Sequence, residues 1–186
     1  MAEQQVVDGI NISGWFQALD TFKQNPQMAQ FRLRAHNEWV GGTHCRTTVK
    51  SFYGAGQERQ HAKSFVLDAD EPEVLLGEDH GPNATEALLY ALASCLNTTF
   101  MYHAAAHKVK IDRLELELEG DLDLRGIAGI SREVRNGFSE IRVKMHAAGD
   151  APAEKLAQLC QMAQERSPVF DMVTHATPVK VNCETR

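Results

Sequence analysis

The longest hydrophobic segment of the chain runs from Ala84 to His107. A turn-like stretch, Glu78 to Pro82, leads into it, and Asn83 can cap a helix there because Glu86 follows three residues later in the capping-box position. The segment is interrupted by polar side chains, namely Ser94, Asn97, Thr98, Thr99 and two histidines. It therefore fits a buried helix better than a membrane span, and we predict one long helix from residue 84 to about residue 107.

Shorter patterns predict two further helices and six strands. Residues 11–27 carry apolar side chains at three- and four-residue spacings, which predict an amphipathic helix. A second such helix is expected from residue 149 to about Arg166, with Pro152 suited to its first turn and Ser167-Pro168 at its end. Strand-forming runs and alternating patterns predict strands at residues 30–38, 43–53, 63–68, 108–121, 138–146 and 178–184.

The segments between these elements have the composition of turns and loops. Gly41-Gly42 is expected to join the first two strands as a hairpin, residues 54–61 to form an exposed connection, and residues 124–136 to form a polar loop. The resulting order is helix, three strands, long helix, two strands, helix and strand. This order is typical of an α+β fold.

Composition and charge exclude several classes of function. The chain has 186 residues, 43% hydrophobic and 24% charged, with a formal net charge of −6 and no basic run, so neither a nucleic acid nor a membrane surface is an expected partner. The N-terminus shows neither a basic start nor an apolar run of signal-peptide length, so we expect the chain to stay in the cytoplasm.

No metal or cofactor is expected from the sequence. The four cysteines, Cys45, Cys95, Cys160 and Cys183, form no CxxC pair and are expected to be free thiols. His103 and His107 lie four residues apart, but no HExxH glutamate accompanies them, and we interpret them as a packed or partly exposed pair at the end of the long helix.

Cys95, in the middle of the long helix, is open to two interpretations. Most free cysteines on a core helix are small buried hydrophobic residues. A reactive thiol instead needs a cation, a hydrogen-bond donor or a helix N-terminus to lower its pKa. Cys95 lies about three turns into the predicted helix, where the dipole effect has faded. Activation would therefore require an arginine from elsewhere in the chain.

Two stretches carry a resemblance to a known family. The run Gly81-Pro82-Asn83-Ala84-Thr85-Glu86 through Ala93-Ser94-Cys95 resembles the central-helix motif of the OsmC/Ohr family, and Ser167 to Asp171 followed by Pro178 to Val181 resembles its closing motif. The resemblance covers residues 30–186 as a single OsmC-like domain, with residues 1–29 as an N-terminal helical extension. It implies an α+β fold in an intertwined homodimer, with long central helices in the middle and antiparallel β-sheets flanking them.

The resemblance also implies thiol redox chemistry linked to oxidative stress. In the family, the cysteine matching Cys95 attacks organic hydroperoxides, and a second cysteine, which precedes the proline matching Pro168, then closes a disulfide. An arginine and a glutamate activate the first cysteine. Among Arg32, Arg34 and Arg46 on the early strands, we predict Arg46 for this role, because it follows the Gly41-Gly42 turn on the second strand of the hairpin.

This chain departs from the family pattern at supporting positions of the site. Ser167 stands where the second cysteine is expected, and Thr85 stands at the position of the glutamate, ten residues before Cys95. Glu86 lies nine residues before Cys95, on the opposite side of a straight helix, and is interpreted as a capping residue. A helix that is regular through Ser167 would place Cys160 and Ser167 on one face. Cys160 could then replace the missing cysteine only if Cys95 lies near the turn at Ser167.

Two functions of different classes follow, and whether the protein is an enzyme is left open. The first is a one-cysteine hydroperoxide reductase in which Cys95 reacts with an organic hydroperoxide and an external thiol restores it. The second is non-catalytic binding of an apolar small molecule at the dimer interface. Four apolar side chains of the long helix are candidates to line such a pocket: Leu88, Leu92, Phe100 and Met101.

Overall fold

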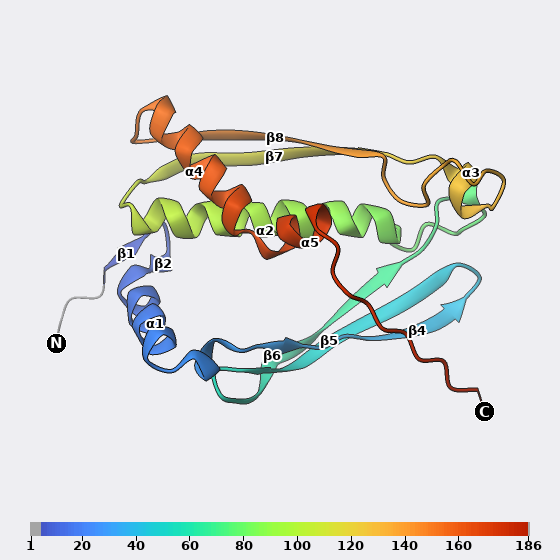
Figure 1. The fold of residues 1–186 in the computed structure, drawn as a ribbon, viewed down its shortest axis with the longest axis horizontal. Helices are drawn as coiled ribbons and strands as arrows, with labels where there is room; N and C mark the ends of the chain where they lie inside the picture. Colours follow the sequence, from blue (N-terminus) through green and yellow to red (C-terminus); the bar gives the residue numbers. More distant parts are fainter. Residues whose placement is uncertain (1–4, 186) are drawn as a thin grey trace. The chain divides into compact units, whose positions relative to one another are not determined.

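The computed structural model describes residues 5–185, and in it helices alternate with antiparallel strands (Figure 1). The chain divides into two compact units, residues 1–88 and 89–186, and each is described by itself. The first holds β1 (Val6–Val7), β2 (Ile10–Asn11), α1 (Ile12–Gln24), η1 (Pro26–Ala29), β3 (Arg32–Leu33), β4 (His36–Gly41), β5 (His44–Gly54), β6 (Gln57–Ala69), η2 (Glu73–Leu75) and the start of α2 (Ala84–Ala106). The second holds the rest of α2, β7 (Ile111–Asp121), α3 (Leu124–Ile127), β8 (Glu140–Gly149), α4 (Ala153–Arg166) and α5 (Pro168–Thr174). The predicted α+β class is confirmed.

Helix α1 lies inside the helix predicted for residues 11–27. The Asn11 side chain accepts a hydrogen bond from the Gly14 backbone N–H, which satisfies one of the free donors of the first turn. The helix ends at Gln24, before Pro26. Residues 1–4 of the predicted N-terminal extension lie outside the described residues, and its boundary at residue 29 stays a prediction.

Strand β5 is the central strand of the sheet in the first unit. It pairs with β4 and β3 along one edge and with β6 along the other. The predicted hairpin at Gly41-Gly42 is confirmed, and Gly42 has the positive φ that its turn requires. The predicted connection over residues 54–61 is wrong, because β6 begins at Gln57. Ala55 and Gly56 both adopt positive φ, which allows a two-residue turn that matches the twist of the strands.

Helix α2 confirms the long helix predicted from Ala84. Its buried side chains recur at four-residue steps and so follow one face, at Leu92, Leu96, Phe100 and Ala104. Lys108, with a positive φ, ends the helix: the Lys108 and Val109 amides donate to the carbonyls of Ala105 and Ala104, as in a Schellman motif. Among the described residues, no helix is long and apolar enough to cross a membrane.

The core of the second unit forms where α4 packs against α2 and the β7–β8 hairpin (Figure 1). Its buried members come from α2, α4 and the segment before β7, and they are Phe100, Ala104, Val109, Leu159 and Ala163. Strands β7 and β8 pair antiparallel along nearly their whole length, with Leu116 opposite Met145. These two strands were predicted, although the loop between them contains the short helix α3.

The C-terminal part of the chain differs from its prediction. Ser167-Pro168 ends α4 as expected, but the same residues also start α5, because Ser167 caps it and Pro168 suits its first turn. The strand predicted for residues 178–184 is wrong: within the described residues this segment is extended and pairs with no strand. Its alternating residues Val179 and Val181 are 80% and 85% exposed.

Candidate functional site

Cys95 lies on α2, between the buried residues Leu92 and Leu96. Its side chain is half-buried, and its carbonyl oxygen accepts a hydrogen bond of 2.7 Å from the Thr99 hydroxyl. The thiol is thus carried on a rigid helix and remains partly accessible. These are the conditions in which a cysteine can react when a nearby cation stabilises its thiolate.

Thr85 and Glu86 take part in the cap at the start of α2. The Asn83 side-chain oxygen accepts hydrogen bonds from the backbone N–H groups of Thr85 and Glu86, at 3.0 and 2.9 Å, and from the Thr85 hydroxyl at 2.7 Å. In return, the Glu86 carboxylate accepts from the Asn83 backbone N–H at 2.9 Å. This reciprocal pair is a capping box, and the capping interpretation of Glu86 is confirmed.

Ser167 is fully buried in the second unit, with 1% of its surface exposed. Its hydroxyl accepts a hydrogen bond from the Phe170 backbone N–H at 3.2 Å and so caps α5. Its ψ of 118° is extended, so α4 ends at Arg166. The expectation that Cys160 and Ser167 share a helix face assumed a helix regular through Ser167, and that assumption is wrong.

Cys160 borders an apolar cavity in the second unit. The cavity has a volume of about 640 Å³ and lies between α4, β8 and α2, with α5 at one side; its lining includes Leu96, Val143, Met145, Leu156, Cys160 and Phe170. Burial raises the pKa of the Cys160 thiol, which lowers its thiolate fraction at neutral pH. Two of the side chains predicted to line a pocket, Leu92 and Phe100, are buried and do not border this cavity.

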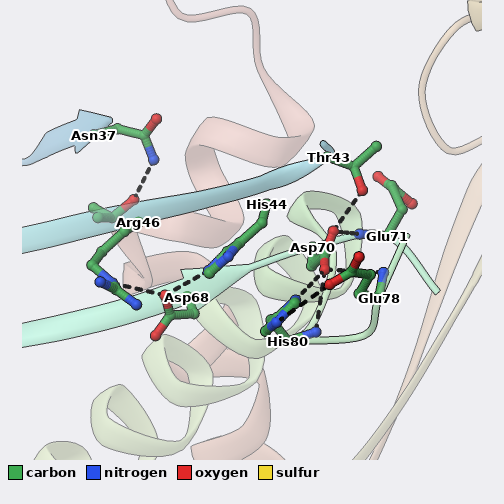
Figure 2. Close-up of polar contacts among 10 residues, drawn as sticks. Asn37, Thr43, His44, Arg46, Asp68, Asp70, Glu71, Glu78 and His80 are labelled. Atoms are coloured by element: carbon green, nitrogen blue, oxygen red, sulfur yellow. Dashed lines mark hydrogen bonds and ion pairs between the residues drawn. The ribbon is translucent and has the colours of Figure 1, made fainter. Parts of the chain in front are cut away.

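Arg46 belongs to a polar cluster on the sheet of the first unit (Figure 2). It lies opposite Asp68 in the β5–β6 register, and its Nε donates to Asp68 Oδ1 at 2.9 Å. His44, two residues earlier on the same strand face, donates from Nε2 to the same oxygen at 2.7 Å. The hydrogen bonds from His44 and Arg46 lower the pKa of Asp68 below its ordinary value. Asp68 is therefore an ionised carboxylate shared by two donors.

A second carboxylate, Asp70, anchors the loop that leads into α2. Buried Asp70 accepts hydrogen bonds from the Thr43 hydroxyl, from His80 Nδ1 and from the backbone N–H groups of Glu71, Glu78 and His80. The Thr43 hydrogen bond, followed by that of His80, lowers the pKa of Asp70 well below its ordinary value, and Asp70 in turn raises the pKa of His80. The two clusters touch through His44 and His80, whose rings stack in parallel at 4.5 Å (Figure 2).

The arginines of the early strands differ in how their guanidinium groups are used. Arg34 donates from both terminal nitrogens to the Glu58 carboxylate, at 2.7 and 2.8 Å. Arg46 donates only from Nε, and its two Nη nitrogens bind no described residue of the first unit. Arg46 therefore keeps the two donors with which a guanidinium can bind an oxyanion.

His44, Asp68, Asp70 and His80 were missed as members of this cluster. The signal available in the sequence is the pair of alternating segments His44-x-Arg46 and Asp68-x-Asp70, because side chains two residues apart share a face of a strand. Use of this signal requires the register of β5 against β6. The predicted connection over residues 54–61 gave the wrong start for β6 and therefore no register. The structure brings Arg46, Thr85 and Glu86 into the first unit and Cys95 and Ser167 into the second.

The histidines at the end of α2 act within the helix. His107 Nδ1 donates to the His103 carbonyl at 2.8 Å. Burial, followed by the charges of His107 and Arg166, lowers the pKa of His103. Among the described residues, no group of three or more histidine, cysteine, aspartate or glutamate side chains is arranged to hold a metal ion.

The segment that contains Cys95 and Ser167 also matches a known family. The family model described as OsmC-like protein matches residues 77–182, more than half of the chain. The chain belongs to the OsmC-like family. The resemblance carried by the central-helix and closing motifs is thereby confirmed. A comparison with curated proteins gives no match.

Solved structures share the OsmC-like fold at low sequence identity. One is an OsmC-like protein of Mycoplasma pneumoniae, with 15% identity and a TM-score of 0.59 over 78% of this chain and 89% of that one. A second is a hypothetical protein of Aquifex aeolicus, with 16% identity and a TM-score of 0.54 over 78% of this chain and 89% of that one. A third is an organic hydroperoxide resistance protein, OsmC, of Legionella pneumophila, with 17% identity and a TM-score of 0.50 over 75% of this chain and 88% of that one. At these identities the likeness establishes the fold.

Proposed function

We propose that this OsmC-like protein reduces organic hydroperoxides through Cys95, with an external thiol as the reductant. The observation that carries the proposal is the position of Cys95, partly accessible on α2 and inside the segment that the family model matches. The organic hydroperoxide resistance protein of Legionella pneumophila, which shares the fold, supports the choice of substrate class.

The reaction proceeds in two stages. The Cys95 thiolate attacks the distal peroxide oxygen, the O–O bond breaks, and the departing alkoxide takes up a proton to give an alcohol, leaving Cys95 as a sulfenic acid. One external thiol then attacks the sulfenic sulfur and releases water. A second thiol cleaves the resulting mixed disulfide, which restores Cys95 and gives the oxidised reductant.

Arg46 is our candidate for the cation that stabilises the Cys95 thiolate and the departing oxygen. Its side chain is 44% exposed and its Nη nitrogens bind no described residue of the first unit, which supports this role because a guanidinium with free terminal donors can bind developing negative charge. Ser167 supports an external reductant, because a serine cannot close a disulfide with Cys95.

The test is consumption of cumene hydroperoxide in the presence of dithiothreitol by the wild type, by Cys95→Ser and by Cys183→Ser. Cys183 is exposed and serves as the matched control. We expect the wild type and Cys183→Ser to turn over and to trap a sulfenic acid at Cys95 with dimedone. Equal consumption by Cys95→Ser, or a wild-type rate no faster than that of free cysteine, would refute the proposal.

We further propose that the protein is a homodimer. The sheet of the first unit exposes apolar side chains, among them Phe65, Val66 and Leu67 on β6 at 44–55% exposure. A small sheet such as this four-stranded one needs a covered apolar face for stability. The extended segment with exposed Val179 and Val181 offers backbone donors and acceptors that pair with no strand. Sedimentation equilibrium tests this proposal, and a monomer at micromolar concentration would refute it.

A second candidate function is binding of an apolar small molecule without turnover. The observation in its favour is the cavity of about 640 Å³ in the second unit, which falls within the size range of small-molecule sites. Native mass spectrometry of Cys95→Ser tests it. A bound species of constant mass would support it, and the mass of the bare polypeptide alone would remove it.

A further inference from the structure

A pair of histidine rings joins the β4–β5 hairpin to the segment that connects β6 to α2 (Figure 2). We call residues 70–83 the connecting segment. His44 begins β5 and His80 lies in the connecting segment. Their rings stack with centroids 4.5 Å apart and with planes that differ by 2°. The His80 side chain is 45% exposed and that of His44 only 11%, so His80 is the outer ring of the pair.

Each ring is bonded through one nitrogen to a carboxylate of its own. His44 Nε2 lies 2.7 Å from Asp68 Oδ1, and His80 Nδ1 lies 2.8 Å from Asp70 Oδ2. Both carboxylates are ionised, because hydrogen bonds, chiefly from His44 to Asp68 and from Thr43 to Asp70, lower their pKa values. An ionised carboxylate only accepts, so each ring carries a hydrogen on its bonded nitrogen. A further proton on the pair therefore binds His44 Nδ1 or His80 Nε2.

The surroundings of the two rings have an excess of negative charge. Charged side chains reach the rings from β5, β6 and the connecting segment, and they are Arg46, Asp68, Asp70 and Glu78. Glu38 of β4 lies one strand further, opposite Arg46. His80 Nε2, the nitrogen open to a further proton, is 3.8 Å from the Glu78 carboxylate. A proton bound there offsets the excess negative charge.

The same two rings border a cavity of about 390 Å³ in the first unit. The cavity is lined by residues 40–44 of the hairpin and, from the connecting segment, by Asp70, residues 76–78 and His80. Because His80 belongs both to the stack and to the cavity wall, the position of its ring sets the access of solvent to His44 and the width of the cavity.

We propose that the His44–His80 ring pair is a pH-sensitive switch: a proton on the pair keeps His80 stacked on His44, and loss of that proton lets the His80 ring turn away from the hairpin and open the cavity. Protonated His80 makes a charge-assisted hydrogen bond to Asp70, which is roughly twice as strong as a neutral one. It is also attracted to Glu78 and to the face of the His44 ring. All three interactions weaken on deprotonation, so the switch closes as the pH falls and opens as it rises. It does not depend on any chemistry at Cys95.

The first measurement is NMR of the full-length protein with carbon-13 in its histidine rings, between pH 5 and pH 9. The ring carbon shift of His80 reports its protonation, and the nuclear Overhauser effect between the two rings reports the stack. We expect this effect to weaken with the midpoint of the His80 titration, as the ratio of stacked to open rings falls about threefold to tenfold. Glu78→Gln should lower both midpoints together, and the matched control Glu73→Gln, an exposed glutamate of the same segment, should move neither. A constant effect across the His80 titration, or midpoints that separate in Glu78→Gln, would overturn the inference.

The second measurement follows the exposure of His44. Diethyl pyrocarbonate modifies accessible imidazoles, and mass spectrometry gives the extent at each histidine. His36, exposed on β4 of the same sheet, serves as the internal reference for the reagent's own pH dependence. From pH 6 to pH 9 the ratio of modification at His44 to that at His36 should rise about threefold to tenfold in the wild type. It should stay flat in His80→Gln, whose side chain binds no proton. A flat ratio in the wild type, or an equal rise in His80→Gln, would show that His80 does not control access to His44.

Discussion

Removal of the cap at the start of α2 should destabilise the protein without slowing the oxidation of Cys95. Asn83→Ala deletes an oxygen that accepts three hydrogen bonds from Thr85 and Glu86, and the loss of such a cap costs about 1–2 kcal/mol. Glu86→Gln keeps an oxygen for the Asn83 N–H but removes a negative charge at a helix N-terminus, which costs about 0.3–1 kcal/mol. In a chain of this length each kcal/mol lowers Tm by about 2–4 °C, so Asn83→Ala should lose roughly 2–8 °C.

The assay pairs thermal unfolding, at one fixed protein concentration, with the rate of sulfenic acid formation at Cys95. Both variants should keep the wild-type rate at a temperature well below their Tm. A double-mutant cycle should show coupling between Asn83 and Glu86, because each side chain bonds the backbone of the other. A large loss of rate in Glu86→Gln with an unchanged Tm would refute the capping account and make Glu86 a catalytic carboxylate.

Three further predictions concern the core, the closing motif and the pH dependence. Leu159→Ala, which truncates a fully buried side chain, should cost about 2–5 kcal/mol in urea unfolding. Ser167→Cys should lose about 1 kcal/mol with its cap and, after peroxide treatment, should gain a disulfide between positions 95 and 167, detected by mass spectrometry; free thiols at both positions would contradict this. Asp70 raises the pKa of His80, so the folded state binds the imidazole proton more tightly than the unfolded state does. The stabilisation of the folded state by protonated His80 is therefore full below pH 6.5 and is lost as the pH rises through the raised pKa. Urea unfolding of His80→Gln from pH 5 to 9 should show a stability difference from the wild type that shrinks as the pH rises, and a constant difference would contradict the assignment.

Elements with strong local signals could be predicted from the sequence. Helix α2 has an asparagine cap, a glutamate three residues later and an uninterrupted apolar face. These neighbouring residues are enough to predict where the helix begins. The β4–β5 hairpin follows from two adjacent glycines between strand-forming runs. In both cases the residues that decide the structure are neighbours in sequence.

The Arg46–Asp68 pair could not be predicted, because its register depends on an irregularity in β6. Gly54 faces Gln57 across the turn, and continuation of that register would place Arg46 opposite Phe65. The register shifts between Val49 and Ser51, and the shift moves the partner of Arg46 to Asp68. A bulge of this kind reflects packing along both strands, so no local pattern in the sequence announces it.

The C-terminal segment differs from its prediction for a related reason. Ser167-Pro168 predicts the end of α4, yet a serine cap followed by proline also favours a new helix, and the sequence does not decide between these two outcomes. The alternation of Val179 and Val181 does favour a strand, but a strand forms only where a partner edge is offered, and sequence alone does not supply one.

The convergence of three backbone amides on Asp70 has a consequence for local unfolding. The N–H groups of Glu71, Glu78 and His80 all donate to one carboxylate. They should therefore exchange with solvent deuterium together, since a single rotation of that side chain releases all three. The segment before α2 would then open as one cooperative unit, on a timescale set by Asp70 and independent of the global unfolding of the chain.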